Sequence, residues 1–187
     1  LLLNVLPVDI ANELKINGRV EPVHYDNVSV LFTDFKGFTQ LAEKMTPREL
    51  VDELDCCFSY FDQVVDKYGL EKLKTIGDSY MCASGIPKPS PTHALQAVYA
   101  ALEILQFMEL RKLHKVYEKT PYWDIRIGIH SGPLLAGVIG NKKFAYDVWG
   151  DTVNTASRME SSGVPGNVNI SHTTFELVKD VFDCEYR

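Results

Sequence analysis

Two polar residues of this 187-residue chain, Lys74 and Asp147, form a pair that could read a purine base. A lysine side chain only donates hydrogen bonds, and an ionised aspartate only accepts them. The Watson–Crick edge of adenine offers the complementary set, an acceptor at N1 and a donor at N6, whereas guanine offers the reverse. A buried mismatch would leave polar groups unpaired, at about 1–3 kcal/mol each. If the fold brings the two residues together, the pair therefore favours adenine.

Two aspartates lie at predicted strand ends or turns, where a scaffold can hold a side chain rigidly and accessibly. Asp34 follows the alternating strand pattern of residues 27–33, and Asp78 lies in a Gly77-Asp78 turn between two short predicted strands. Two carboxylates can hold two divalent cations, which is the arrangement that phosphoryl chemistry uses for an in-line displacement. Each aspartate also has an ordinary explanation, because Gly-Asp is common turn chemistry and Asp34 could cap a helix.

Three further polar residues are notable for their spacing or for their position in a strand. Asn154 and Arg158 are four residues apart in a predicted helix over 151–161, so they share one helix face. The alternative for this face is simple solvation. Arg126 lies in mid-strand on the polar side of the alternating segment 124–130, which is an unusual place for a permanent cation. The alternative for Arg126 is a structural partner for a buried acid.

The segments that carry these residues, 32–39, 74–81 and 146–158, resemble the catalytic domain of class III nucleotidyl cyclases, and the resemblance covers nearly all of residues 26–187. It implies that two divalent cations, magnesium or manganese, are bound by Asp34, Phe35 and Asp78. It implies that substrate is contacted by Lys74, Asp147, Val148, Phe38, Thr39 and Arg126. It implies two catalytic residues, Asn154 to orient the ribose and Arg158 to stabilise charge on the α-phosphate.

The resemblance predicts an adenylyl cyclase that converts ATP to 3′,5′-cyclic AMP and pyrophosphate. In the family each active site lies between two subunits, so a homodimer of this chain would hold two complete sites. Guanylyl cyclases of this family carry Glu and Cys in place of the Lys74 and Asp147 pair, which makes that activity the nearest alternative. A non-catalytic module that binds nucleotide and dimerises is the alternative from another class.

Composition restricts the partners. Hydrophobic residues make up 45% of the chain and charged residues 24%, with a net charge of −6, which argues against nucleic acid or an anionic membrane as a partner. The four cysteines include no Cys-x-x-Cys pair, which favours a reduced, cytoplasmic setting. No apolar run approaches the roughly 20 residues of a membrane-spanning helix.

Interleaved helices and hairpins predict an α+β fold, a ferredoxin-like mixed or antiparallel sheet with helices packed on one side. Residues 1–26 are expected to be the end of a linker helix and its connection from an upstream regulatory region, and residues 27–187 the catalytic domain. Residues 133–140 are expected to form a hairpin arm, and a last strand is expected from Phe182 onward. The final family hairpin, which carries a phosphate-binding lysine, is not among these residues.

Overall fold

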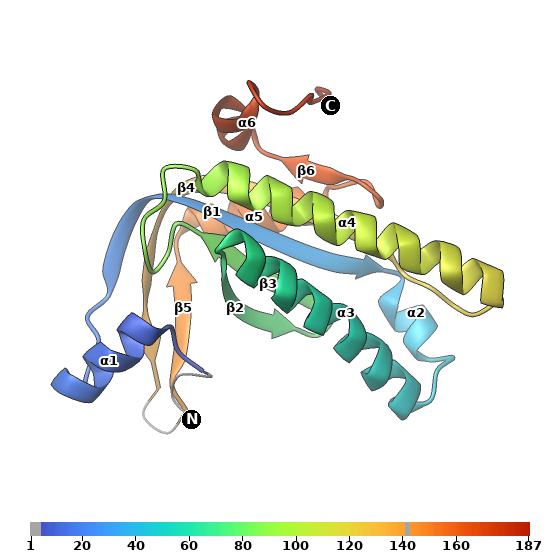
Figure 1. Ribbon diagram of the computed structural model, residues 1–187, viewed down its shortest axis with the longest axis horizontal. Coiled ribbons are helices and arrows are strands. Elements are labelled where there is room, and N and C mark those ends of the chain that lie inside the picture. Colours follow the sequence, from blue (N-terminus) through green and yellow to red (C-terminus); the bar gives the residue numbers. More distant parts are fainter. Residues whose placement is uncertain (1–4, 141–142) are drawn as a thin grey trace.

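The computed structural model describes residues 5–140 and 143–187, and in this part of the chain the strands form one six-stranded sheet (Figure 1). Five strands follow the order β2-β3-β1-β4-β5 in antiparallel pairs, and β6 pairs in parallel with β4. The elements are α1 (Val8–Asn17), β1 (Val23–Lys36), α2 (Phe38–Ala42), α3 (Pro47–Tyr68), β2 (Glu71–Ile76), β3 (Ser79–Ser84), α4 (His93–Glu118), β4 (Asp124–Ile139), β5 (Ala145–Trp149), α5 (Asp151–Ser161), β6 (Val168–Ile170) and α6 (His172–Val178). The α+β class with a mixed sheet is therefore confirmed.

The central strands β1 and β4 are longer than the sequence pattern indicates. β1 begins at Val23, and β4 runs without interruption through Pro133, where a separate hairpin arm was expected. The register of β1 against β4 shifts between Tyr25 and Val28, so Pro133 lies opposite an irregularity in the ladder. A proline lacks the N–H that a ladder needs, and a bulge is one of the few places where a strand tolerates it. The expected hairpin arm is therefore present and pairs with β5, but it is the continuation of β4 and not a separate strand.

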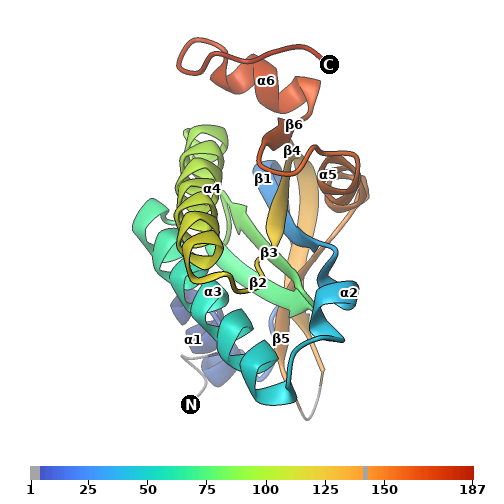
Figure 2. The same ribbon diagram turned by 90° about the vertical axis from the view of Figure 1, so that its right-hand side faces the viewer.

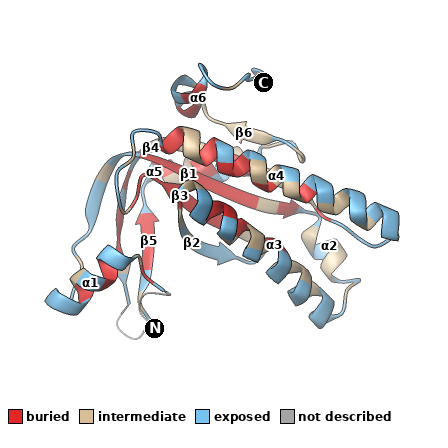
Figure 3. Cartoon of the chain, in the orientation of Figure 1, coloured by how far each residue is buried: buried red, intermediate tan, exposed pale blue. Residues whose placement is uncertain are grey.

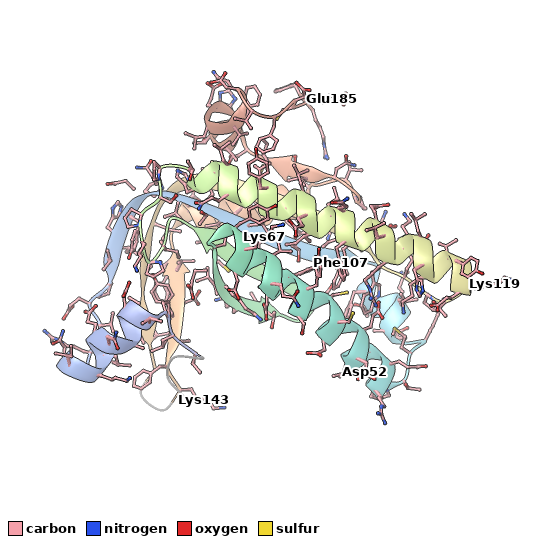
Figure 4. All side chains as sticks on the ribbon, in the orientation of Figure 1. Asp52, Lys67, Phe107, Lys119, Lys143 and Glu185 are labelled. Atoms are coloured by element: carbon pink, nitrogen blue, oxygen red, sulfur yellow. The ribbon has the colours of Figure 1, made fainter. Side chains whose placement is uncertain are left out.

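Helices α3 and α4 lie side by side over one face of the sheet, as predicted (Figures 1 and 2). Their contact includes stacked rings of Tyr60 and Phe107, 3.9 Å between centroids, and a 2.6 Å ion pair between Lys67 and Glu103. Figure 4 labels Lys67 and Phe107 along this seam. Helix α3 begins at a capping box, in which the Thr46 side chain accepts from the Glu49 N–H.

Helix α5 lies on the opposite face of the sheet, which corrects the expectation of helices on one side only (Figure 2). The approach of α5 depends on Gly128 in β4. A Cβ added to Gly128 would come within 1.9 Å of the backbone nitrogen of Glu160, so a larger residue would push the helix away. Helix α1 joins Ala156 of α5 in a second core cluster on strand side chains such as Val30 and Val148.

Burial follows these layers. Figure 3 shows β1 buried through its central part, whereas the far ends of α3 and α4 are exposed.

Residues 183–187 adopt no strand, so the strand expected from Phe182 onward is not formed. Part of the expected linker helix, residues 1–4, lies outside the described residues. Among the helices in the described part of the chain, none combines the length and apolar character that crossing a membrane requires.

Candidate functional site

The structure brings Lys74 and Asp147 into direct contact. Lys74 lies on β2 and Asp147 on β5, at opposite ends of the strand order, and the curved sheet places these two strands against each other. The Lys74 Nζ donates to Asp147 Oδ2 at 2.5 Å, and the Val148 N–H donates to Asp147 Oδ1 at 2.9 Å. The lysine side chain is 42% exposed and the aspartate 12%. The lysine keeps two further N–H groups, and each carboxylate oxygen keeps a lone pair, so both remain able to bond a base.

The two aspartates Asp34 and Asp78 also lie together, on the β1 end and on the β2–β3 turn. Gly77 has a φ of 62°, a left-handed conformation that glycine adopts without strain, and this turn holds Asp78 beside β1. The Phe35 N–H donates to Asp78 Oδ2 at 3.3 Å. Burial and the negative charge of Asp34 raise the pKa of the Asp78 carboxyl. The two carboxylates are therefore close enough to repel each other, which a cation would relieve.

Arg126 provides the cation that Asp34 contacts in this structure. The β1–β4 register places Arg126 directly opposite Asp34, and Arg126 Nη2 donates to Asp34 Oδ2 at 2.7 Å. On its other side, Arg126 Nε lies 2.9 Å from Glu160 Oε1. Glu160 was not predicted as a site residue. The available signal was its position four residues after Ala156 on the buried side of α5, where an acid needs a partner.

The loop after Asp34 is anchored by aromatic side chains. Phe35 is buried and stacks on Trp123 with a centroid separation of 5.0 Å, and Phe38 packs on the same ring at 5.3 Å. Thr39, next to Phe38 at the start of the short helix α2, is exposed. The N–H groups in a first helical turn have no acceptor within the helix. The backbone at Phe38 and Thr39 is therefore available to an outside acceptor.

Asn154 and Arg158 lie on the exposed side of α5, as their spacing predicted. Within residues 5–140 and 143–187, neither side chain forms an ion pair or hydrogen bond, and neither contacts Asp34 or Asp78 in this way. One chain thus assembles two groups, the Lys74–Asp147 pair and the Asp34–Asp78–Arg126 cluster. In the same chain Arg158, the arginine expected to act on phosphate, faces outward.

The donor set at Asp34 and Asp78 fits a hard divalent cation. Magnesium is usually bound through one or two carboxylates, with water and substrate phosphates as the other ligands. The described residues contain no group of three or more acidic, histidine or cysteine side chains placed to hold a metal. Any cation here would therefore depend on the two aspartates together with backbone or substrate oxygens.

Glu71, at the start of the strand that carries Lys74, gives a pH-dependent prediction. Burial, with a smaller contribution from the negative charge of Asp66, raises the pKa of Glu71 from 4.5 to about 7. The contribution of Glu71 to stability is fully present below pH 4.5, where the carboxyl is protonated in both the folded and the unfolded state, and it is lost as the pH rises through about 7. Because Glu71 is partly exposed, we expect Glu71→Gln to stabilise the fold at pH 8 by only about 1 kcal/mol, with little difference at pH 5.

Urea unfolding of wild type and Glu71→Gln at both pH values measures this effect. Glu43→Gln, at an exposed glutamate, is the matched control and should change stability at neither pH. An equal effect of Glu71→Gln at pH 5 and pH 8 would contradict the assignment.

Comparison with known proteins identifies the family. The Adenylate and Guanylate cyclase catalytic domain family matches residues 20–187, and the chain belongs to this family. Human guanylyl cyclase C is 44% identical over 183 residues, 97% of this chain and 17% of that protein. An adenylate cyclase of Mycobacterium tuberculosis is 43% identical over 97% of this chain and 40% of that protein. The chain thus spans less than half the length of these curated relatives.

Solved structures agree with the fold. The adenylyl cyclase CyaB from P. aeruginosa has a TM-score of 0.82 and 30% identity, over 88% of this chain and 85% of that chain. The catalytic core of a rhodopsin-guanylyl cyclase with converted specificity, in complex with ATPalphaS, has a TM-score of 0.79 and 36% identity, over 87% and 86%. The fold is therefore that of a class III cyclase catalytic domain.

Proposed function

We propose that this chain is an adenylyl cyclase domain, which converts ATP to 3′,5′-cyclic AMP and pyrophosphate at sites shared between two copies. The observation that carries the choice of base is the contact between Lys74 and Asp147. The lysine donates to N1 of adenine, and the aspartate accepts from the N6 amino group. Guanine would present a donor to the lysine and an acceptor to the aspartate.

Overall similarity does not choose between the two nucleotides. The guanylyl cyclase relative at 44% identity and the adenylate cyclase relative at 43% differ by only one percentage point in their identity to this chain. The base-reading positions are more informative, because a site built to hydrogen-bond one edge rejects the wrong edge by leaving buried polar groups unpaired. Lys74 and Asp147 therefore favour ATP over GTP as substrate.

In the proposed reaction the ribose 3′-hydroxyl attacks the α-phosphorus, the new O3′–P bond forms with loss of the hydroxyl proton, and pyrophosphate leaves. Divalent cations, magnesium or manganese, supply charge neutralisation and a lower pKa for that hydroxyl when bound. Asp34 and Asp78 would hold them, with the backbone oxygen of Phe35. The backbone of Phe38 and Thr39 would receive the triphosphate, together with Arg126.

The second copy would supply Asn154 and Arg158 from the exposed face of its α5. Asn154 would orient the ribose, and Arg158 would stabilise negative charge that grows on the α-phosphate in the transition state. An outward-facing arginine with no ion-pair partner among the described residues supports this role, because its charge is free for another molecule. The same second copy would supply Lys74 and Asp147, which the fold already holds together.

Two alternatives are addressed by the same residues. A guanylyl cyclase would require Lys74 and Asp147 to bind guanine, which places a donor against the lysine and an acceptor against the aspartate. A binding module without catalysis would not need the Asp34–Asp78 pair beside Arg126. We also propose that the domain acts in the cytoplasm and that an upstream regulatory region controls it; α1 itself packs in the second core cluster and belongs to the folded unit.

The base-reading pair is tested by exchanging it. Lys74→Glu with Asp147→Cys should move the ratio of kcat/KM for ATP over GTP towards GTP by about tenfold or more, because donor and acceptor are exchanged at the base. The comparable core of the rhodopsin-guanylyl cyclase, described as converted in specificity, supports the choice of experiment. Each single variant should mainly lose activity, since it leaves one mismatch. An unchanged ratio in the folded double variant would show that these residues do not read the base.

A further inference from the structure

Arg126 lies between two carboxylates, and only one of them belongs to the proposed metal site. Its Nη2 is 2.7 Å from Asp34 Oδ2, and its Nε is 2.9 Å from Glu160 Oε1. The side chains are 26% exposed for Arg126, 25% for Asp34 and 9% for Glu160. The contact with Glu160 lacks hydrogen-bond geometry, so both the Nε and Oε1 atoms are buried without a hydrogen bond. The arginine is thus well bonded to Asp34 and incompletely bonded to Glu160.

This arrangement creates competition at Asp34. A divalent cation on Asp34 Oδ2 would lie about 4 Å from the guanidinium, and like charges at that separation repel by several kcal/mol even at the effective dielectric of a protein surface. This repulsion favours movement of the guanidinium away from Asp34 as the cation binds. Moving it into solvent-poor surroundings without a partner would leave a buried charge, which is costly.

Glu160 offers the place to which the arginine can move. Its carboxylate already contacts Arg126 Nε, and a small rotation would complete the hydrogen bond that the present geometry lacks. Glu160 is fixed in this position because α5 packs on β4 at Gly128, where the helix backbone and the strand are in close contact. The backbone that carries the acceptor is therefore fixed, and the Glu160 side chain (9% exposed) is more enclosed than that of Arg126 (26%), so the arginine has more room to move.

We propose that Glu160 is a positioning residue that draws Arg126 away from Asp34 and so opens Asp34 to a divalent cation. In the absence of the cation Arg126 neutralises Asp34, and in its presence Arg126 is retained by Glu160, close to where the triphosphate would lie. The proposal rests on the proposed function in one respect, that Asp34 binds the cation.

The test is a double-mutant cycle on manganese binding, measured on the nucleotide-free chain by electron paramagnetic resonance of free Mn²⁺. Glu160→Gln should weaken Mn²⁺ binding about fivefold, because Arg126 then stays on Asp34. Arg126→Met should strengthen it, because the competing cation is gone. In the Arg126→Met background, Glu160→Gln should have little further effect. Glu160→Asp, which keeps the charge on a shorter side chain, should bind Mn²⁺ with intermediate affinity and covers the case in which the glutamine variant does not fold.

Simple electrostatic attraction between Glu160 and the cation predicts the opposite pattern. Under that explanation Glu160→Gln weakens binding as much or more when Arg126 is absent, and this result would overturn the proposal, as would an unchanged affinity in Glu160→Gln itself. Glu53→Gln is the matched control, because Glu53 pairs with Arg111 at 2.6 Å between α3 and α4, and it should leave Mn²⁺ binding unchanged. Asp34→Ala should abolish binding. If it does not, the metal assignment fails independently of Glu160.

Discussion

Replacing Asp34 with alanine is expected to lower the rate of cyclisation by about a thousandfold or more, to near background. The reason is that Asp34 would hold the divalent cations, which stabilise the transition state by several kcal/mol because they neutralise its negative charge. Each loss of about 1.36 kcal/mol of this stabilisation lowers the rate tenfold. Asp78→Ala should have the same effect, since Asp78 lies beside Asp34 on the β2–β3 turn. Initial rates with saturating Mn²⁺ and ATP measure both variants.

Stability should change little in Asp34→Ala, because Arg126 keeps Glu160 as a partner. Asp124→Ala is the matched control. Asp124 also lies in the central β1–β4 pair, has a side chain 35% exposed and forms a 2.7 Å ion pair with Lys112, yet has no proposed role. It should retain most of the activity. Near-normal turnover by Asp34→Ala would mean that the two-cation assignment is wrong.

Mixing two inactive variants is expected to restore activity. Asp34→Ala lacks a cation ligand, and Arg158→Ala lacks the transition-state cation. In a mixed dimer one site receives both defects and the other receives neither. With random exchange about half of the dimers are mixed and each has one intact site of two, so activity should approach roughly a quarter of wild type per total protein.

The physical basis of this expectation is the outward position of Arg158, which makes no contact with Asp34 among the described residues. Each variant alone should be almost inactive. Subunit exchange must be verified separately, for example with two affinity tags on the two variants. If exchange occurs and no activity returns, the site is built within one chain and the shared-site proposal is wrong.

The parts of the site with local signals could be predicted from the sequence. The Gly77-Asp78 turn defines its own hairpin, the Thr46 capping box begins α3, and the helix expected over residues 151–161 is α5 with the same bounds. These features depend on residues within a few positions of one another, so short-range rules describe them well. The exposed face with Asn154 and Arg158 follows from helical spacing alone.

The parts that depend on register between distant strands could not be predicted in the same way. The contact of Lys74 with Asp147 joins residues 73 positions apart, and it was expected from a family resemblance and from base chemistry, whereas no periodicity indicates it. The Arg126–Glu160 contact needs both the β1–β4 register and the close approach of α5 at Gly128. From the sequence, a buried acid was one alternative partner for Arg126, and Glu160 was not identified. The packing of α5 on the second face was missed for the same reason.

Formation of cyclic AMP from ATP by this domain can be assayed directly. The dimerised wild-type domain is incubated with Mn²⁺ or Mg²⁺ and either ATP or GTP, the cyclic product is identified by chromatography, and kcat/KM is determined for each nucleotide. The donor and acceptor at Lys74 and Asp147 predict cyclic AMP with pyrophosphate, and a kcat/KM for ATP at least about tenfold above that for GTP. An equal or higher kcat/KM for GTP, or no cyclic product from either nucleotide, would show that the domain is not an adenylyl cyclase.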